Sequence, residues 1–571
     1  MTKDQGPKAV KHEITRLIQQ AIRKAQKKGD LPSFTIPEIP LEHPKQVEHG
    51  DYATPICLQL AHLARTAPLK IADTVVKYLP ETEYLGKIEV AHPGYINFTL
   101  DDAWLAQQVE AILAAGERYG NIDIGQGKKV QVEYGSANPT GPLHVGSGRN
   151  IVLGDSLANV LQAAGYDVQR EYYVNDAGSQ MRLFNETLYA RYAQALGQEA
   201  EMPEGGYSGQ YMVEWGQEIA EEEGDKYLNM PYAEAVLAIG KAGLAKALDC
   251  IKDDVELLGV HYDRWYSEQS LYDDGHFARI MTILRQGGHV VEREGAIWFT
   301  ATELGGDKDE VIIRSDGEAG YFASDIAYHY HKFVERDFDW VIDVWGADHQ
   351  GHVPRMKAMM RALGLDPEAL TLIIYQLVTL KRSGEVVRLS KRTGEIITLR
   401  EVIEDVGPDA VRFFLLSRAA DSQMDFDLDL AVEQSAENPV YYVQYGHARI
   451  ASILRYATER VPDPSTTLRT SFAAGDVSLL RHPAELALIR QMLLLPEVVE
   501  QAAENLTPHH LTYYAQDLAS AFHSFYKECR VVSSDAAEAE LNKARLKLVS
   551  AAKIVLAKTL RLMGMTAPER M

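Results

Sequence analysis

His144 directly follows a turn of small residues in the segment NPTGPLHVGSGR (138–149). Gly141 and Pro142 break regular structure before it, and an apolar rhythm from about Leu143 onward predicts a helix. The first turn of a helix has free N–H groups, and an imidazole beside it can donate to a phosphate. The segment therefore indicates a site for a nucleotide phosphate, although a histidine in this position could equally be a simple helix cap.

A second group of candidate residues is basic and flanked by glycines. The segment KRSGEVVRLSKRTGE (381–395) contains Arg388, Ser390 and Lys391. A loop of this composition suits a mobile clamp on a triphosphate, in which a lysine acts as a point charge. An exposed basic hairpin is the plainer alternative.

A third group follows an apolar run in DWVIDVWGADHQGHVPRM (339–356). Asp348, His349 and His352 come just after Gly346, where the run ends. Ligands of open α/β sheets bind at the C-terminal edge of the strands, so these side chains are candidates for nucleotide contact. A metal site is the alternative, because His349 and His352 are three residues apart. It is disfavoured because no cysteine or third ligand joins them at helical spacing.

The elements that must position these groups alternate between strands and helices. Val130 and Val132 alternate with polar neighbours and predict a strand, which the turn and the helix follow, and 168–174 predicts a second strand. Apolar runs at 340–344 and 372–380 predict two more. We therefore expect a Rossmann-like parallel sheet with a nucleotide at its edge.

Helical segments flank the predicted sheet. Residues 10–25 place apolar side chains at helical spacing and begin a small N-terminal module. The locally acidic stretch 199–225 is interpreted as part of a helical insertion, with its charges on a solvated face. The remaining chain after about residue 406 is strongly helical.

One C-terminal helix interleaves aromatic and basic side chains. Tyr441, Tyr445, Arg449 and Arg455 recur there at short intervals. Such a helix can stack unpaired bases and hold phosphates, which favours a nucleic-acid partner. A tyrosine stripe in a helical core is the alternative, and about half of the tyrosines in this region would suit that interpretation.

Composition limits the class of protein. The chain has 571 residues, of which 46% are apolar and 24% charged, as in soluble multidomain proteins. No apolar run approaches the roughly 18 residues that span a bilayer, and the N-terminus lacks the apolar core of a secretory signal. Cys57, Cys250 and Cys529 are far apart, so we expect a cytoplasmic protein without structural zinc or disulfides. The net charge of -23 does not exclude a nucleic-acid partner, which needs only a local basic face.

Taken together, these motifs resemble those of the class I aminoacyl-tRNA synthetases, and their context resembles the arginyl-tRNA synthetase family. The segment 138–149 is similar to the HIGH signature, with Ser147 in place of its last histidine. RLSKR is similar to the KMSKS loop, with Arg388 at the first lysine and Lys391 at the second. Segments near both ends, HGDYATPICLQLAHLAR, HPGYINFTL, GPDAVRFFLLSR and MGMTAPERM, resemble the family as well, so the likeness covers nearly the whole chain in order.

The resemblance implies a multidomain α/β enzyme. A small α+β N-terminal domain that contacts tRNA is expected over 1–115, and a Rossmann-like catalytic domain over 116–405, with a helical insertion at about 185–285. An all-α anticodon-binding domain is expected over 406–571. The implied reaction activates L-arginine with ATP to arginyl-adenylate and transfers it to the 3′ end of tRNA(Arg), releasing AMP and diphosphate. Magnesium would accompany the ATP, and a monomer is expected.

The resemblance also assigns roles to individual residues. His144 and Lys391 are the expected catalytic donors. Four residues of the C-terminal helix, Tyr441, Tyr445, Arg449 and Arg455, are the expected tRNA contacts. The expected ATP contacts are Pro139, Thr140, Gly141, Pro142, Leu143, His144, Val145, Gly146, Ser147, Gly148, Gly346, Asp348, His349, His352, Arg388, Ser390 and Lys391. The expected arginine contacts are Glu133, Ser136, Asn138, Tyr321, Asp325 and His349.

The assignment of Asp325 depends on its spacing as well as on the family. Tyr321 lies four residues before it, which sets both on one face of a helix. A guanidinium presents a fork of donors and needs a planar acidic acceptor. Without the resemblance, an ordinary carboxylate on a helix surface would be the preferred interpretation.

Three alternatives remain open from the sequence. A class I nucleotidylyltransferase would share the histidine turn but has no use for the long helical C-terminal part. A synthetase for another amino acid would keep both ATP motifs but lack the pairing of Tyr321 with Asp325. A non-catalytic tRNA-binding relative should have lost His144 or Lys391, and both are present.

Overall fold

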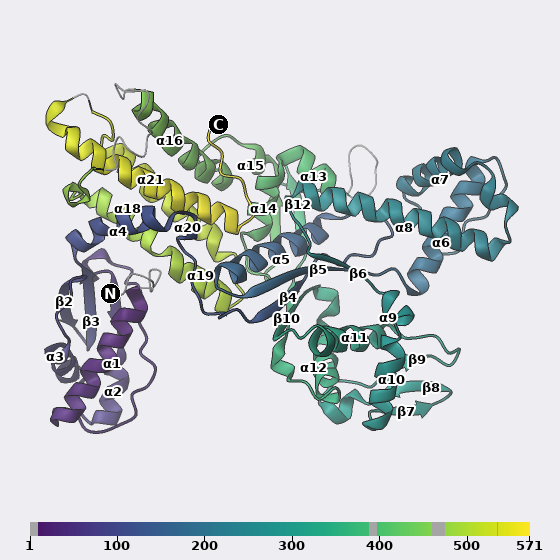
Figure 1. The fold of residues 1–571 in the computed structure, drawn as a ribbon, viewed down its shortest axis with the longest axis horizontal. Helices are drawn as coiled ribbons and strands as arrows, with labels where there is room; N and C mark the ends of the chain where they lie inside the picture. Colours follow the sequence, from purple (N-terminus) through teal and green to yellow (C-terminus); the bar gives the residue numbers. More distant parts are fainter. Residues whose placement is uncertain (1–9, 388–396, 460–473, 534) are drawn as a thin grey trace.

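A five-stranded parallel sheet lies at the centre of the molecule (Figure 1). The computed structural model describes residues 10–387, 397–459, 474–533 and 535–571, without the side chains of Val47, Tyr321 and Ala536. The strands, in spatial order, are β11 (Leu370–Tyr375), β10 (Trp340–Gly346), β4 (Lys129–Glu133), β5 (Asp167–Val174) and β6 (Arg264–Ser267). Every neighbouring pair is parallel. The strands expected near residues 130, 168 and 340 are confirmed, and so is the Rossmann-like fold.

Strand order reverses beside β4, which pairs with β5 on one side and β10 on the other. A reversal of this kind opens a crevice at the C-terminal edge of the strands. Helix α5 (Val145–Ala163) starts at this edge and is buried along most of its length. Gly154 allows its close approach, because an added Cβ would lie 2.2 Å from the Tyr134 ring. Gly165, with a φ of +89°, follows the helix end, as the sequence predicts.

The single strand expected over 372–380 is wrong. The chain leaves the central sheet after β11, and β12 (Val378–Arg382) belongs to another sheet with β13 (Glu385–Val386) and β14 (Met424–Asp427). The break has a clear cause at Gln376. Its N–H donates to Ala420 O (2.9 Å), and its carbonyl accepts from Arg149 Nη1 (2.6 Å), so neither group is available to the central sheet.

The N-terminal part is a separate small layer of helices on a sheet. Strands β1 (Tyr52–Thr54), β3 (Tyr95–Leu100) and β2 (Leu85–Ala91) form an antiparallel sheet in that order. Helices α1 (Val10–Lys28), α2 (Ile56–Ala64) and α3 (Pro68–Tyr78) accompany it, and α4 (Asp102–Ala115) leads to the rest of the chain. The helix expected over 10–25 is therefore confirmed.

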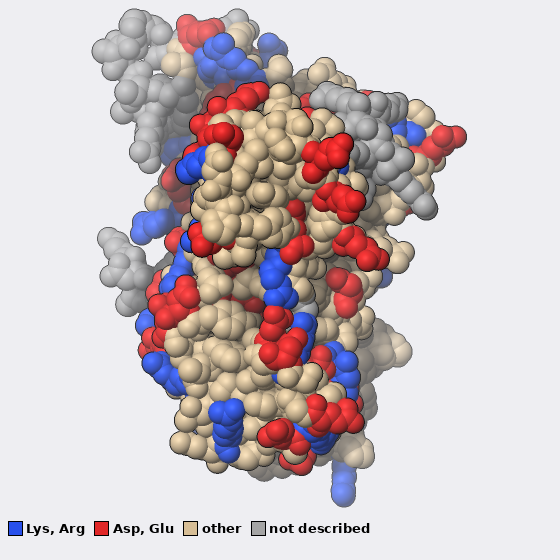
Figure 2. Space-filling model, turned by 90° about the vertical axis from the view of Figure 1, so that its right-hand side faces the viewer, with Lys and Arg blue, Asp and Glu red and all other residues tan. Residues whose placement is uncertain are grey.

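Two insertions separate β5 from β10. Helices α6 (Gly178–Ala195), α7 (Gln210–Glu223) and α8 (Tyr232–Leu257) form an arm at the right of Figure 1. Glu221, Glu222 and Glu223 are exposed there, as expected for a solvated face. Figure 2 views the molecule from this side, where acidic and basic side chains are interspersed among uncharged ones.

The second insertion contains a small sheet that the sequence did not reveal. Strands β7 (Val290–Arg293), β8 (Ala296–Phe299) and β9 (Glu310–Ile313) are antiparallel. The surrounding helices are α9 (Ser270–Asp273), α10 (His276–Gln286), α11 (Tyr321–Tyr330) and α12 (Val353–Ala362), with a π-helical turn at His331–Glu335. A second hydrophobic core fills this region and continues beneath one face of the central sheet.

Helices dominate the C-terminal part, as expected. They are α13 (Leu399–Val406), α14 (Pro408–Leu416), α15 (Leu428–Val432), α16 (Pro439–Glu459), α18 (Pro483–Leu493), α19 (Leu495–Glu504), α20 (His510–Glu528) and α21 (Ala539–Leu562). One core joins them to α4, α5 and the N-terminal sheet. No helix in the described ranges is long and apolar enough to cross a membrane.

The residues after α21 connect the C-terminal helices to α5. Arg412 of α14 is fully buried; it pairs with Asp155 of α5 and donates from Nε to Met563 O (2.8 Å). Further along this tail, Pro568 O accepts from His447 Nδ1 of α16 (2.8 Å). The tail is therefore bound directly to α14 and α16, and α14 is paired with α5.

Candidate active site

The histidine turn lies at the C-terminal edge of β4. His144 is the N-cap residue of α5, and its backbone bridges Thr398. Leu143 O accepts from Leu399 N–H (2.7 Å), and Thr140 O accepts from Tyr211 OH (2.8 Å). The turn is thus held from two sides by segments far away in sequence.

His144 is exposed at the start of α5, and Gly146 and Ser147 in the first turn of the helix are half-buried. Desolvation by the surrounding protein lowers the pKa of His144. A neutral imidazole can still donate one N–H, and the unpaired N–H groups of the first helical turn lie beside it. The arrangement is suited to an anion such as a phosphate.

Strand β10 also contributes residues to the C-terminal edge of the central sheet. Gly346 ends this strand, and a 3₁₀ turn (Ala347–His352) carries the predicted polar cluster. His349 Nε2 lies 3.3 Å from Asp348 Oδ2, and the His349 and His352 rings meet edge to face at 5.6 Å. Asp348 and His349 are exposed, so they face solvent in the crevice rather than the core.

The basic loop is described only at its flanks. Arg388, Ser390 and Lys391 lie outside the described residues. Lys381 and Arg382, which precede them, pair with Asp425 and Asp405 respectively. After the loop, Thr398 returns to the backbone of His144. The chain that follows the loop is therefore adjacent to the histidine turn.

Glu133 and Ser136 lie at the exit from β4, but Glu133 already has partners. It is buried, and its Oε1 accepts from Ser136 Oγ (3.1 Å) while its Oε2 accepts from Lys332 Nζ (2.6 Å). Ser136 Oγ in turn accepts from the Tyr173 N–H (3.1 Å). The turn residue Asn138 is exposed and donates to Gln180 Oε1 (2.6 Å).

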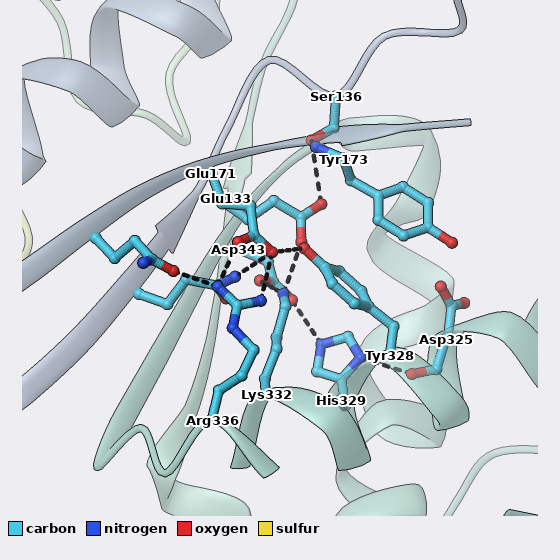
Figure 3. A network of polar contacts seen from close by, with 12 residues as sticks. Glu133, Ser136, Glu171, Tyr173, Asp325, Tyr328, His329, Lys332, Arg336 and Asp343 are labelled. Carbon is cyan, nitrogen blue, oxygen red and sulfur yellow. Dashed lines mark hydrogen bonds and ion pairs between the residues drawn. The ribbon is translucent and has the colours of Figure 1, made fainter. Parts of the chain in front are cut away.

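Asp325 has a different environment. It lies in the first half of α11, four residues after the start of the helix at Tyr321, whose side chain lies outside the described part. No described side chain donates to the Asp325 carboxylate, and Figure 3 shows it apart from the contacts drawn. Burial raises the pKa of Asp325 to about 7, and nearby His329 offsets only part of this effect. The helical placement expected from the spacing is confirmed.

A buried ion network extends from the Glu133 carboxylate to the backbone carbonyl of Asp325 (Figure 3). Lys332 Nζ is fully buried and contacts Glu133 Oε2 (2.6 Å) and Asp343 Oδ1 (2.9 Å). His329 Nε2 contacts Asp343 Oδ2 (2.8 Å), and its Nδ1 donates to the Asp325 carbonyl (2.8 Å). Burial opposes charge on Lys332, but Asp343 and Glu133 outweigh it and raise the pKa of Lys332. The same contacts hold the pKa of Asp343 at about 2.

The network carries an excess of negative charge. Glu171 adds a fourth carboxylate to Glu133, Asp325 and Asp343, and it accepts from Arg336 Nη1 (2.8 Å). Lys332 pairs with Glu133 and Asp343, and Arg336 pairs with Glu171, whereas the Asp325 carboxylate pairs with neither cation. A further cation entering beside Asp325 would be stabilised by this surplus. Sequence reasoning missed Lys332, His329 and Asp343, although Asp343 in the middle of an apolar strand was a detectable signal.

The aromatic and basic side chains of α16 lie together on the surface. The Tyr441 and Tyr445 rings stack at 5.7 Å, and the Arg449 guanidinium lies 4.9 Å from the rings of both Tyr445 and Tyr526. Tyr445, Arg449 and Tyr526 border a cavity of about 960 Å³ that Arg455 also lines. The other basic lining residues are Lys527, Arg530 and Arg570.

Family comparisons agree with this geometry over the whole chain. Residues 108–452 match the model described as "tRNA synthetases class I (R), catalytic domain". Residues 12–100 match the "Arginyl tRNA synthetase N terminal domain", and 443–571 match the "DALR anticodon binding domain". The parallel sheet with its histidine turn is thus that of a class I aminoacyl-tRNA synthetase.

Individual relatives narrow the class further. The arginine–tRNA ligase of Dehalococcoides mccartyi is 54% identical over 563 residues, covering 99% of both chains. That of Heliobacterium modesticaldum is 49% identical, with the same coverage. The arginyl-tRNA synthetase structure from Thermus thermophilus has a TM-score of 0.73 and 25% identity, covering 98% of this chain and all of that one. The chain belongs to the arginyl-tRNA synthetase family.

Proposed function

We propose that the chain is an arginine–tRNA ligase that works in two steps. ATP, bound with Mg²⁺ as its substrate complex, reacts with L-arginine to give arginyl-adenylate and diphosphate. The arginyl group then passes to the 3′ end of tRNA(Arg), and AMP leaves. The single observation that carries the choice of amino acid is the unpaired Asp325 carboxylate within a network of surplus negative charge.

The first step is an in-line attack of the arginine carboxylate on the α-phosphorus of ATP. Charge gathers on the phosphate oxygens, so positioned donors supply most of the rate enhancement. We assign this role to His144, at the start of α5, and to Lys391. The edge residues of β10, Asp348, His349 and His352, would line the adenosine side of the same crevice.

Arginine would be held at both of its ends. Ser136 and Asn138, at the exit from β4, are the proposed contacts for its amino-acid end. The guanidinium would meet Asp325, with Tyr321 and the Glu133 network beside it. A buried guanidinium needs charged acceptors, because otherwise its desolvation is uncompensated.

The proposed partner surface for tRNA is the cavity beside α16. Its lining combines Tyr445 and Tyr526 with several basic side chains, which suits unpaired bases and phosphates together. We place the domain boundaries near 115/116 and 405/406, at the ends of α4 and α13. We further propose a monomer in the cytoplasm, where the three free cysteines would stay reduced.

A charging assay tests the proposal directly. The purified chain is given total tRNA, ATP, Mg²⁺ and each of the twenty amino acids in turn, and acid-precipitable product is measured. Arginine alone should be attached. Attachment of lysine or another amino acid at a comparable rate would contradict the assignment, as would adenylate formation without any transfer to tRNA.

A further inference from the structure

A cluster of two histidines and a glutamate lies outside the candidate active site. His276 is the first residue of α10, and His331 and Glu335 begin and end the π-helical turn after α11. The potential ligand atoms of the three residues all lie within 4.8 Å of one another. Because His276 and His331 are 55 positions apart, no sequence motif connects them.

Both imidazoles approach the same carboxylate oxygen. His331 Nδ1 lies 2.8 Å from Glu335 Oε2, and His276 Nδ1 lies 3.2 Å from it. Tetrahedral zinc, with bonds of about 2.0–2.1 Å to nitrogen and oxygen, separates its ligand atoms by roughly 3.3 Å. The two separations from Glu335 Oε2 are close to this value, and the two imidazole nitrogens lie within 4.8 Å of each other, so a modest shift of the rings would let the three atoms share one ion.

Hydrogen bonding alone leaves the cluster incomplete. His276 is buried, with 9% of its surface exposed, and its Nδ1 has no hydrogen-bond partner among the described residues. Glu335 Oε2 thus forms a hydrogen bond with His331 Nδ1, whereas His276 Nδ1 lies near the same oxygen without forming one. Unpaired buried nitrogens are costly, and an ion between the three groups would satisfy this one.

The neighbouring charges orient the cluster without blocking it. Arg279 pairs with Oε1 of Glu335 and leaves Oε2 to the histidines. Arg336 is committed to Glu171 and Gln169 instead.

We propose that His276, His331 and Glu335 form a binding site for one divalent transition-metal ion of the zinc type, with water as the remaining ligand. Two histidines and a carboxylate are a donor set that zinc accepts. This site would replace the sequence-based expectation of no structural zinc, which considered only the cysteines and the pair His349 and His352. The ion would fasten α10 to the turn that carries Lys332, next to the buried network.

Binding of Zn²⁺ alone to the untagged, chelator-treated chain tests the site. Calorimetry and metal analysis after gel filtration should give about one equivalent per chain, and a Co²⁺ complex should show the intense visible bands of tetrahedral coordination. His276→Gln and His331→Gln should each weaken binding by more than about tenfold, the scale on which even a supporting partner affects a metal site.

Two controls match the site variants. His12→Gln alters a histidine that contacts the Glu500 carboxylate at 3.1 Å but does not belong to a cluster of potential metal ligands. The double variant His349→Gln/His352→Gln removes the other close histidine pair. Both should bind zinc like the original chain. Unchanged zinc binding in His276→Gln and His331→Gln would overturn the proposal. The absence of a stoichiometric zinc site, or of tetrahedral Co²⁺ bands, in the original chain would also overturn it. The measurement on the original chain does not depend on whether the variants fold.

Discussion

The carboxylate of Asp325 is the residue on which amino-acid selection should depend most. It is unpaired among the described side chains and lies where a guanidinium would complete the charge balance. Asp325→Ala should weaken arginine use by about 2–5 kcal/mol, the cost of stranding one charge of a buried pair. Asp325→Asn should be intermediate, because an amide has one acceptor oxygen and no charge. Steady-state charging with arginine titrated at fixed ATP and tRNA measures this, and an unchanged KM for arginine would leave Glu133 as the main acceptor.

The same carboxylate should make arginine binding depend on pH. Burial, together with Glu268, Glu133 and Asp343, favours the protonated form of Asp325, and His329 opposes it, giving a pKa of about 7. Only the ionised form attracts a guanidinium, so KM for arginine should rise as pH falls below about 7, by up to about tenfold per unit. The KM profile between pH 6 and 8.5 checks this; the slope should disappear in Asp325→Asn, and a flat profile in the original chain would argue against the role.

Lys332 should matter for stability more than an exposed lysine in a similar contact. Lys332→Met leaves Glu133 and Asp343 without their shared cation, which should cost about 3–5 kcal/mol of unfolding free energy. Lys77→Met, which breaks an exposed pair with Asp30 of similar length, should have a much smaller effect because solvent screens that pair. Urea unfolding measures both. Adding Glu133→Gln should recover part of the loss, and equal effects of the two lysine variants would contradict the importance of burial.

At the scale of elements, the sequence predicts most of the fold because periodicity records burial. The strand at β4 and the helix α5 follow from alternation, helical spacing and a terminal glycine. The prediction of a single strand over 372–380 was wrong for a different reason. Its apolar run is continuous, and the break at Gln376 depends on Arg149 and Ala420, which no local pattern reveals.

The residues of the candidate site also divide into those that the sequence predicts and those that it does not. His144 and the end of β10 are detectable because turns and strand ends have local signatures. The partner of Glu133 is not, because Lys332 lies 199 positions away and only the fold brings it close. Contacts of this kind are decided by tertiary packing, so a single sequence shows the charges but not their pairing.

Helix α16 provides the prediction for tRNA recognition. Tyr445→Ala and Arg449→Ala should each weaken tRNA use by about 1–3 kcal/mol, the usual contribution of one stacking side chain. KM for arginine and ATP should remain close to the original values. Tyr513→Ala, which alters an exposed tyrosine on α20 outside the cavity, is the control. Nitrocellulose-filter binding and charging with titrated tRNA measure the effect, and a loss equal to that of the control would remove this face from the proposed interface.

At the scale of the whole molecule, the proposed sites for arginine and tRNA lie on elements that are connected through shared packing. The C-terminal tail contacts α16 through His447 and reaches α5 through Arg412 and Asp155. Because members of the arginyl-tRNA synthetase family commonly need tRNA before they activate the amino acid, we expect arginine-dependent exchange between ATP and diphosphate to require tRNA. Exchange assays with and without tRNA measure this. Robust exchange with protein, ATP and arginine alone would refute the coupling while leaving the proposed ligase activity intact.

The tail also determines when a newly made chain can become active. Residues 539–571 are translated after the elements they contact, yet α21 packs on α4, and Met563 completes the surroundings of the buried Arg412. While this segment is still in the exit tunnel of the ribosome, α4 and α14 lack these contacts. Early domains commonly fold during synthesis, but here the core around α4 and α5 is complete only after α21 has left the ribosome. Nascent or prematurely terminated chains would consequently expose that apolar surface to chaperones and proteases.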